Sequence, residues 1–135
     1  MRKLILTLAS LAAVATALPA AAASRSPEEK LAREIEGRVA GDPVDCINLR
    51  NVRSSRIIPG TAIVYDAGST IYVNRPRGGA SSLDSWDVLV TKLHSSQLCS
   101  IDTVQLQDSS SRMLSGIVFL GDFVPYRKVK ANGTD

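Results

Sequence analysis

Cys46 and Cys99 are the only cysteines in this 135-residue chain. In an exported protein such a pair forms an intramolecular disulfide by default, because the compartment is oxidising. Closing a loop of roughly 50 residues contributes about 4 kcal/mol by the chain-entropy estimate, a large share of a small domain's stability. A metal site using both cysteines and His94 is the alternative, but the sequence lacks a paired-ligand motif such as Cys-x-x-Cys. We therefore expect a disulfide, no metal and no cofactor.

The first 23 residues have the pattern of a secretory signal peptide. Arg2 and Lys3 form a basic start, residues 4–18 form an apolar run, and Pro19 with the alanines at 20–23 provides a break and small residues for cleavage. The apolar run is too short and too interrupted for a transmembrane helix, which needs about 20 predominantly apolar residues. The sequence therefore predicts cleavage after Ala23 and a periplasmic or secreted protein.

The charge balance of the mature chain limits its partners. The full chain has 16 Lys and Arg residues against 13 Asp and Glu residues, and loss of the leader leaves 14 basic residues. Nucleic-acid-binding proteins usually carry a pronounced basic excess, and segments attracted to membranes gather about 4 to 8 Lys or Arg residues. We expect no nucleic-acid partner and no transmembrane segment in the mature chain. An unknown envelope protein or an anionic ligand is the expected partner.

Residues 24–43 are expected to form a short helix and a linker. Ser26 to Glu29 is a capping-box pattern with proline at the first helical position. Gly37 weakens the last turn, so the helix is expected to be a loosely attached arm. Residues 44–130 would then form a single disulfide-bonded β domain, and 131–135 a tail. The apolar positions of the helix recur every four residues, at Leu31, Ile35 and Val39.

The rest of the chain has the pattern of short strands. Residues 62–65 and 70–73 flank a four-residue turn and predict a hairpin. A further strand is expected at 88–91. In 103–107, Val104 and Leu106 alternate with polar residues, which predicts a strand with one solvent-exposed face.

Residues 116–121 form an apolar run bounded by glycines, which predicts a central strand covered on both faces. A strand at either 47–49 or 56–58 brings the count to about six. The sequence predicts no long helix between the strands, so the crossover connection that parallel strands need is not expected. The expected fold is therefore mainly β: a small antiparallel barrel or curled sheet with a short N-terminal helix.

An ordered set of short motifs resembles a family of small exported bacterial proteins of unknown function. The motifs are Cys46-Ile47, Leu98-Cys99-Ser100 with Asp102, and Leu120-Gly121 with Phe123, Pro125 and Tyr126. Members of that family often carry two further cysteines, near Ala80 and Val118 of this chain. Their joint absence here implies that those two pair with each other in the family, which again leaves Cys46 with Cys99. The resemblance implies no established activity.

No catalytic motif stands out. His94 is the only histidine, and the sequence has no Gly-x-Ser-x-Gly elbow and no Gly-x-x-x-x-Gly-Lys phosphate loop. The aspartates are typical of turns and caps. We therefore expect no catalytic residues and a non-enzymatic binding or interaction module of the bacterial envelope. A small hydrolase using His94 is an alternative, and it requires a serine and an aspartate beside that histidine.

Arginine is the residue type that most suggests a binding surface, because its planar fork donates two parallel hydrogen bonds to a carboxylate or phosphate. The loop at 74–82 is stiffened by proline and could insert into the cleft of a partner protein. An inhibitor of a periplasmic hydrolase is therefore a second alternative function. The competing interpretations are that the arginines are ordinary solvated surface charges and that the loop is an ordinary connection between strands. The candidate binding residues are Arg50, Arg53, Arg56, Arg75 and Arg77.

Overall fold

The computed structural model describes residues 23–130, which contain one α-helix, ten β-strands and two short 3-10 helices. The predicted signal peptide, except for Ala23, and the predicted tail lie outside these residues. The strands form three antiparallel sheets, so the expectation of a mainly β antiparallel fold is confirmed. The described strands do not close into a barrel, and the expected number of about six was too low. No helix in the described part is long and apolar enough to span a membrane.

The helix α1 (Pro27–Glu34) begins at the predicted capping box. The Ser26 hydroxyl accepts a hydrogen bond from the Glu29 amide at 3.2 Å, and the Glu29 carboxylate accepts one from the Ser26 amide at 2.8 Å. The helix is shorter than predicted because Gly37 takes a left-handed conformation, with φ of 71°. Val39 was therefore wrongly placed on the helix: it lies in strand β1 (Arg38–Ala40) and is 59% exposed.

Sheet A has five strands and contains the predicted hairpin. Its interior strand β4 (Ala62–Asp66) is buried on both faces, because Ile63 and Tyr65 alternate with Ala62 and Val64. The hairpin partner is β5 (Thr70–Asn74), with Tyr65 opposite Tyr72. The order across the sheet is β1, β10 (Phe123–Lys128), β5, β4 and β3 (Ser54–Ile58).

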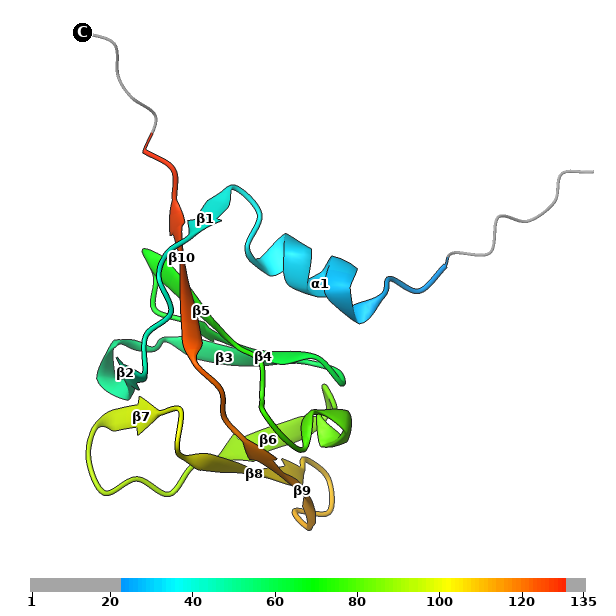
Figure 1. The fold of residues 1–135 in the computed structure, drawn as a ribbon. Coiled ribbons are helices and arrows are strands. Elements are labelled where there is room, and N and C mark those ends of the chain that lie inside the picture. Colours follow the sequence, from blue (N-terminus) through cyan, green and yellow to red (C-terminus); the bar gives the residue numbers. More distant parts are fainter. Residues whose placement is uncertain (1–22, 131–135) are drawn as a thin grey trace, which may run out of the picture.

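Sheet A lies between α1 on one face and the other two sheets on the opposite face (Figure 1). Leu31 of α1 is 3% exposed and packs against the face formed by Ile58, Ala62, Val64, Ile71 and Val73. The helix is also tied to the sheet by the ion pairs Arg56–Glu34 and Arg75–Glu28. The expectation of a loosely attached arm was therefore wrong, because burying one leucine anchors the amphipathic face.

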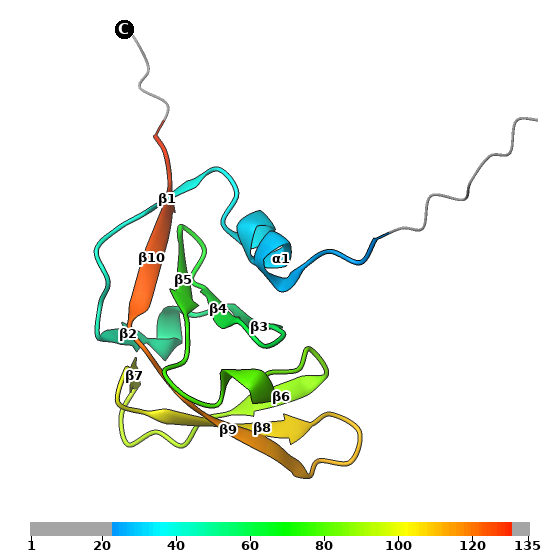
Figure 2. The ribbon, with the colours of Figure 1, turned by 45° about the vertical axis from the view of Figure 1, so that its right-hand side comes forward.

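Sheet C consists of β6 (Asp87–Val90), β8 (Thr103–Asp108) and β9 (Leu114–Phe119), in that order. The strands predicted at 88–91 and 103–107 are confirmed as β6 and β8, and Val104 and Leu106 are fully buried. The prediction of a central strand at 116–121 was wrong, because β9 is an edge strand and Phe119 is 53% exposed. The outer face of sheet C has no layer over it in the described part of the chain (Figure 2).

Two very short strands, β2 (Cys46–Asn48) and β7 (Gln97–Cys99), form the remaining sheet. Ile47 and Leu98 point into the main core, which lies between sheet A and the other two sheets. The core also contains Leu83, which follows the 3-10 helix η2 (Ala80–Ser82). Tyr65 and Phe123 meet in it with ring centroids 5.8 Å apart.

The turn between β8 and β9 gives a pH-dependent prediction. The Ser110 hydroxyl donates to the Asp108 carboxylate at 2.6 Å, and the Ser111 amide donates to it at 2.7 Å; these bonds lower the pKa of Asp108 to about 2. The turn should therefore be fully stabilised above the unfolded aspartate pKa of about 3.9 and lose this contribution as the pH falls towards 2. Carboxyl NMR titration should give this low midpoint, and Ser110→Ala should raise it; an ordinary midpoint would contradict the geometry.

Candidate functional site

A groove of about 490 Å³ lies at the end of sheet A where β4 turns into β5. One wall comes from the chain between β2 and β3, which includes the 3-10 helix η1 (Leu49–Asn51). The other wall comes from the turn and the start of β5. Tyr72 belongs to the face of sheet A that carries the main core, opposite the face covered by α1. The lining residues are Arg50, Asn51, Arg53, Ala67, Ser69, Thr70 and Tyr72.

The position of Arg50 depends on the disulfide-linked strands β2 and β7. The Asn48 side chain caps η1 by accepting a hydrogen bond from the Arg50 amide at 3.0 Å. The Leu49 amide donates to the Ser96 carbonyl at 2.9 Å, which ties η1 to the segment before β7. The covalent link between Cys46 and Cys99 therefore holds both segments that orient Arg50.

Arg53 is positioned by the β4–β5 turn. Its amide donates to the Asp66 carbonyl at 2.7 Å, and its guanidinium lies directly over Gly68. Gly68 has φ of 82°, and a Cβ at this position would lie 2.9 Å from Arg53 Cζ. The left-handed turn therefore favours glycine here, and a larger side chain would displace the Arg53 guanidinium from its present position. The Asp66 carboxylate accepts from the Gly68 amide at 2.7 Å and fixes the turn.

The guanidinium groups of Arg50 and Arg53 make no ion pair and no hydrogen bond with other residues in the described range 23–130. Arg38 adds a third positive charge at this turn, where its guanidinium donates to the Ser69 carbonyl at 2.9 Å. Sequence reasoning missed Arg38 because it assigned this residue to the helix. The two unpaired guanidinium groups, with the hydroxyls of Ser69, Thr70 and Tyr72 beside them, offer donors suited to an anion.

The other three candidate arginines lie elsewhere and bond within the protein. Arg56 pairs with Glu34, and Arg75 makes two 2.9 Å hydrogen bonds to the Glu28 carboxylate, which lower the pKa of Glu28. Arg77 donates to the Leu120 and Ser100 carbonyls, each at 2.7 Å. These contacts fasten α1 and the loop after β5 to the body. The five arginines predicted as candidates therefore do not form one cluster.

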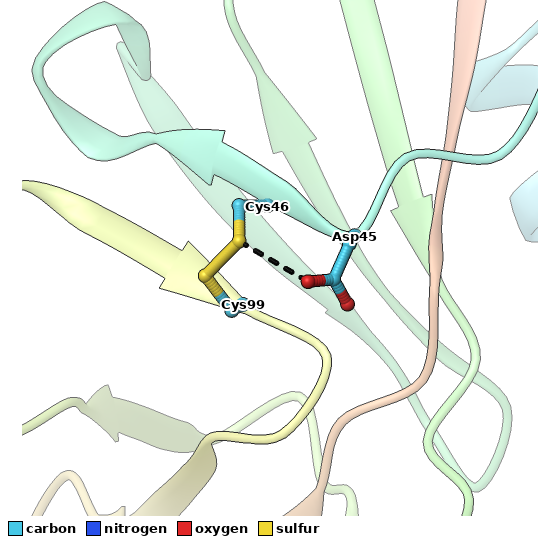
Figure 3. Close-up of side chains that lie close together, drawn as sticks. All are labelled: Asp45, Cys46 and Cys99. Atoms are coloured by element: carbon cyan, nitrogen blue, oxygen red, sulfur yellow. Dashed lines mark hydrogen bonds between the residues drawn. A yellow bond between two sulfur atoms is a disulfide. The ribbon is translucent and has the colours of Figure 1, made fainter.

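The disulfide between Cys46 and Cys99 is present as predicted, and Asp45 lies beside it (Figure 3). Asp45 Oδ2 is 3.5 Å from Cys46 Sγ, while Oδ1 accepts a hydrogen bond from the Ser100 hydroxyl. A carboxylate and two sulfur atoms within reach of one another resemble a metal-ligand set. Oxidised cysteines provide no thiolate, however, so this group does not have the donors that zinc prefers.

His94 lines a separate hollow of about 220 Å³ on sheet C. Asp102 and Thr103 line the same hollow, but the Asp102 carboxylate accepts a hydrogen bond from the Cys99 amide at 2.7 Å. No serine is among the residues that line this hollow. His94 is thus near an aspartate and a threonine hydroxyl, without the serine that a Ser-His-Asp hydrolase requires.

Comparison of the chain with protein-family models, curated proteins and solved structures finds no match. The resemblance to a family of small exported bacterial proteins therefore stays a prediction.

Proposed function

We propose that this protein is an exported, non-enzymatic binding module of the bacterial envelope that holds an anionic group of its ligand in the Arg50–Arg53 groove. The observation that carries the proposal is a groove of ligand size that contains two arginines with no acidic partner among residues 23–130. The disulfide supports an oxidising compartment outside the cytoplasm.

The chemistry of the groove favours a carboxylate or phosphate. Each guanidinium donates in a planar fork, and Ser69, Thr70 and Tyr72, which line the same groove, carry hydroxyls that are donors as well. The two alternatives have less support. Arg75 and Arg77, which an inhibitory loop would present, are engaged in internal bonds, and the His94 hollow lacks a serine.

Titration of the purified protein with inorganic phosphate and, separately, with succinate tests the proposal. Isothermal calorimetry and amide NMR shifts at residues 50–53 and 67–72 should report saturable binding of at least one probe. Arg50→Ala and Arg53→Ala should each weaken it by about 10- to 100-fold, because a hydrogen bond to a charged group contributes about 1.5–3 kcal/mol. The preferred probe distinguishes a phosphate ligand from a carboxylate ligand.

Arg33→Ala is the matched control, because it removes the same charge from the exposed surface of α1 on the opposite face of sheet A. Its affinity should stay within about twofold of the original protein at physiological salt, where distant surface charges are screened. Equal losses in all three variants would show a nonspecific effect of net charge. Unchanged binding in both groove variants would overturn the proposal.

A further inference from the structure

The outer face of sheet C is uncovered within residues 23–130, and the side chains that its three strands place on this face are uncharged. Val104 and Leu106 of β8 are fully buried, so Thr103, Gln105 and Gln107 point to the outside. Residues directly opposite in an antiparallel sheet share a face, which adds side chains from both neighbouring strands. We call these eight residues the sheet C face: Val88, Val90, Thr103, Gln105, Gln107, Leu114, Ile117 and Phe119.

Apolar side chains are exposed here to an unusual degree. Val88 is 51% exposed and Ile117 41% exposed, and both lie in strand interiors. Three further apolar residues adjoin these strands and are strongly exposed: Trp86 precedes β6, Met113 precedes β9, and Ile101 lines a hollow with Val90 and Gln105. In contrast, the outer face of sheet A is covered by α1 (Figure 2). The exposed apolar side chains of β6 and β9 lie on either side of the polar row of β8. Exposed apolar side chains gathered on one face in this way mark a place where another surface binds.

We infer that the sheet C face binds the same face of a second copy of this protein, giving a two-fold symmetric dimer. An isologous interface must be complementary to itself. The eight residues carry no charge, and the hollow that Val90, Thr103 and Gln105 line also holds one basic and one acidic residue, Lys92 and Asp102. The face and this hollow therefore have no net charge that would repel a second copy or select a partner of opposite charge. Gln105 and Gln107 form a central polar row, and each amide both donates and accepts, so it can bond to its own symmetry mate.

The size of the face sets the expected strength of the dimer. Three strands about 4.8 Å apart and about six residues long, at about 3.4 Å per residue, cover roughly 15 by 20 Å. That is less than half of the roughly 800 Å² per partner in a standard interface, so the adjoining residues Trp86, Ile101 and Met113 must also contribute. The dimer should therefore be reversible, with a dissociation constant on the order of 10 μM to 1 mM.

Sedimentation equilibrium of the purified protein from about 10 μM to 1 mM tests the inference. The weight-average mass should rise towards twice the monomer mass. Ile117→Lys and Val88→Lys each place a charge within the interface from a different strand, and each should weaken the dimer at least about tenfold. Val39→Lys is the matched control, because Val39 is an exposed apolar strand residue of sheet A, and it should dimerise like the original protein.

Thermal unfolding of each variant establishes that it is folded, and either lysine variant alone is sufficient. A protein that stays monomeric up to roughly 1 mM would overturn the inference and assign the face to a different partner. Lysine variants that dimerise as tightly as the original protein would overturn it as well. No anion is needed in this measurement, so its failure is separate from failure of the Arg50–Arg53 groove to bind phosphate or succinate.

Discussion

The double variant Cys46→Ala, Cys99→Ala should have a free energy of unfolding about 4 kcal/mol lower than that of the oxidised protein. The disulfide closes a loop across a sequence separation of 53 residues, and the chain-entropy estimate for such a loop gives this value. Small domains have only about 5–15 kcal/mol in total, so the variant should unfold at a much lower denaturant concentration. Urea unfolding followed by circular dichroism measures the difference.

Urea unfolding of the original protein in its oxidised and reduced states separates the effect of the covalent link from the effect of replacing the cysteine side chains. The original protein, measured with and without a reducing agent, has one sequence in two covalent states, and its two unfolding curves should differ by a similar amount. The β2–β7 pair has only three residues in each strand, so its alignment depends strongly on the bond. A loss below about 1 kcal/mol in both comparisons would contradict the prediction and indicate that the unfolded chain is already compact.

Local sequence signals predicted the elements whose causes are local. The capping box at Ser26 fixes the start of α1, and the Asp66–Ser69 turn between two β-branched runs predicts the β4–β5 hairpin. The three-residue strands β1, β2 and β7 were largely missed, because so few residues cannot show an alternating pattern. The burial of β9 was overestimated for a related reason: an apolar run shows suitability for a strand, but not whether a second layer covers it.

The sequence identified arginine as the important residue type but could not separate its roles. Arg75 bonds to Glu28, 47 residues away, and Arg77 bonds to the carbonyl of Leu120, so these roles depend on the tertiary fold. The spacing of Arg50 and Arg53 was ambiguous, because their relative direction depends on whether the chain is helical or extended. In the structure η1 begins at Leu49 and ends at Asn51, and Arg50 and Arg53 line the same groove.

Asn74 shows the same limit for a buried polar residue, since its sequence neighbours indicate only a loop. The residue is fully buried at the end of β5 and forms two hydrogen bonds with the peptide groups of Gly121. Asn74 Nδ2 donates to the Gly121 carbonyl at 2.6 Å, and the Gly121 amide donates to Asn74 Oδ1 at 3.0 Å. A Cβ on Gly121 would lie 2.4 Å from the Arg75 carbonyl oxygen, so the two chain segments pass too closely for another side chain.

Asn74→Ala should therefore lower the free energy of unfolding by about 3 to 4 kcal/mol, because it leaves two buried backbone groups without partners at about 1–3 kcal/mol each. Asn51→Ala is the control, since Asn51 is exposed and should change stability by less than about 0.5 kcal/mol. Denaturant unfolding at pH 7 provides the comparison. An Asn74→Ala loss below about 1 kcal/mol would show that water or a local shift replaces the lost bonds.

Asn74→Asp tests the hydrogen-bond pattern itself. The ionised carboxylate can accept from the Gly121 amide but cannot donate to its carbonyl, whereas the protonated acid can do both. Burial should raise the folded-state pKa of this aspartate above its unfolded value of about 3.9. Stability relative to the original protein at the same pH should therefore be highest below about pH 4 and fall as the pH rises through the folded-state value. A pH-independent difference would mean that the donor to the Gly121 carbonyl contributes little, and that packing alone makes Asn74 necessary.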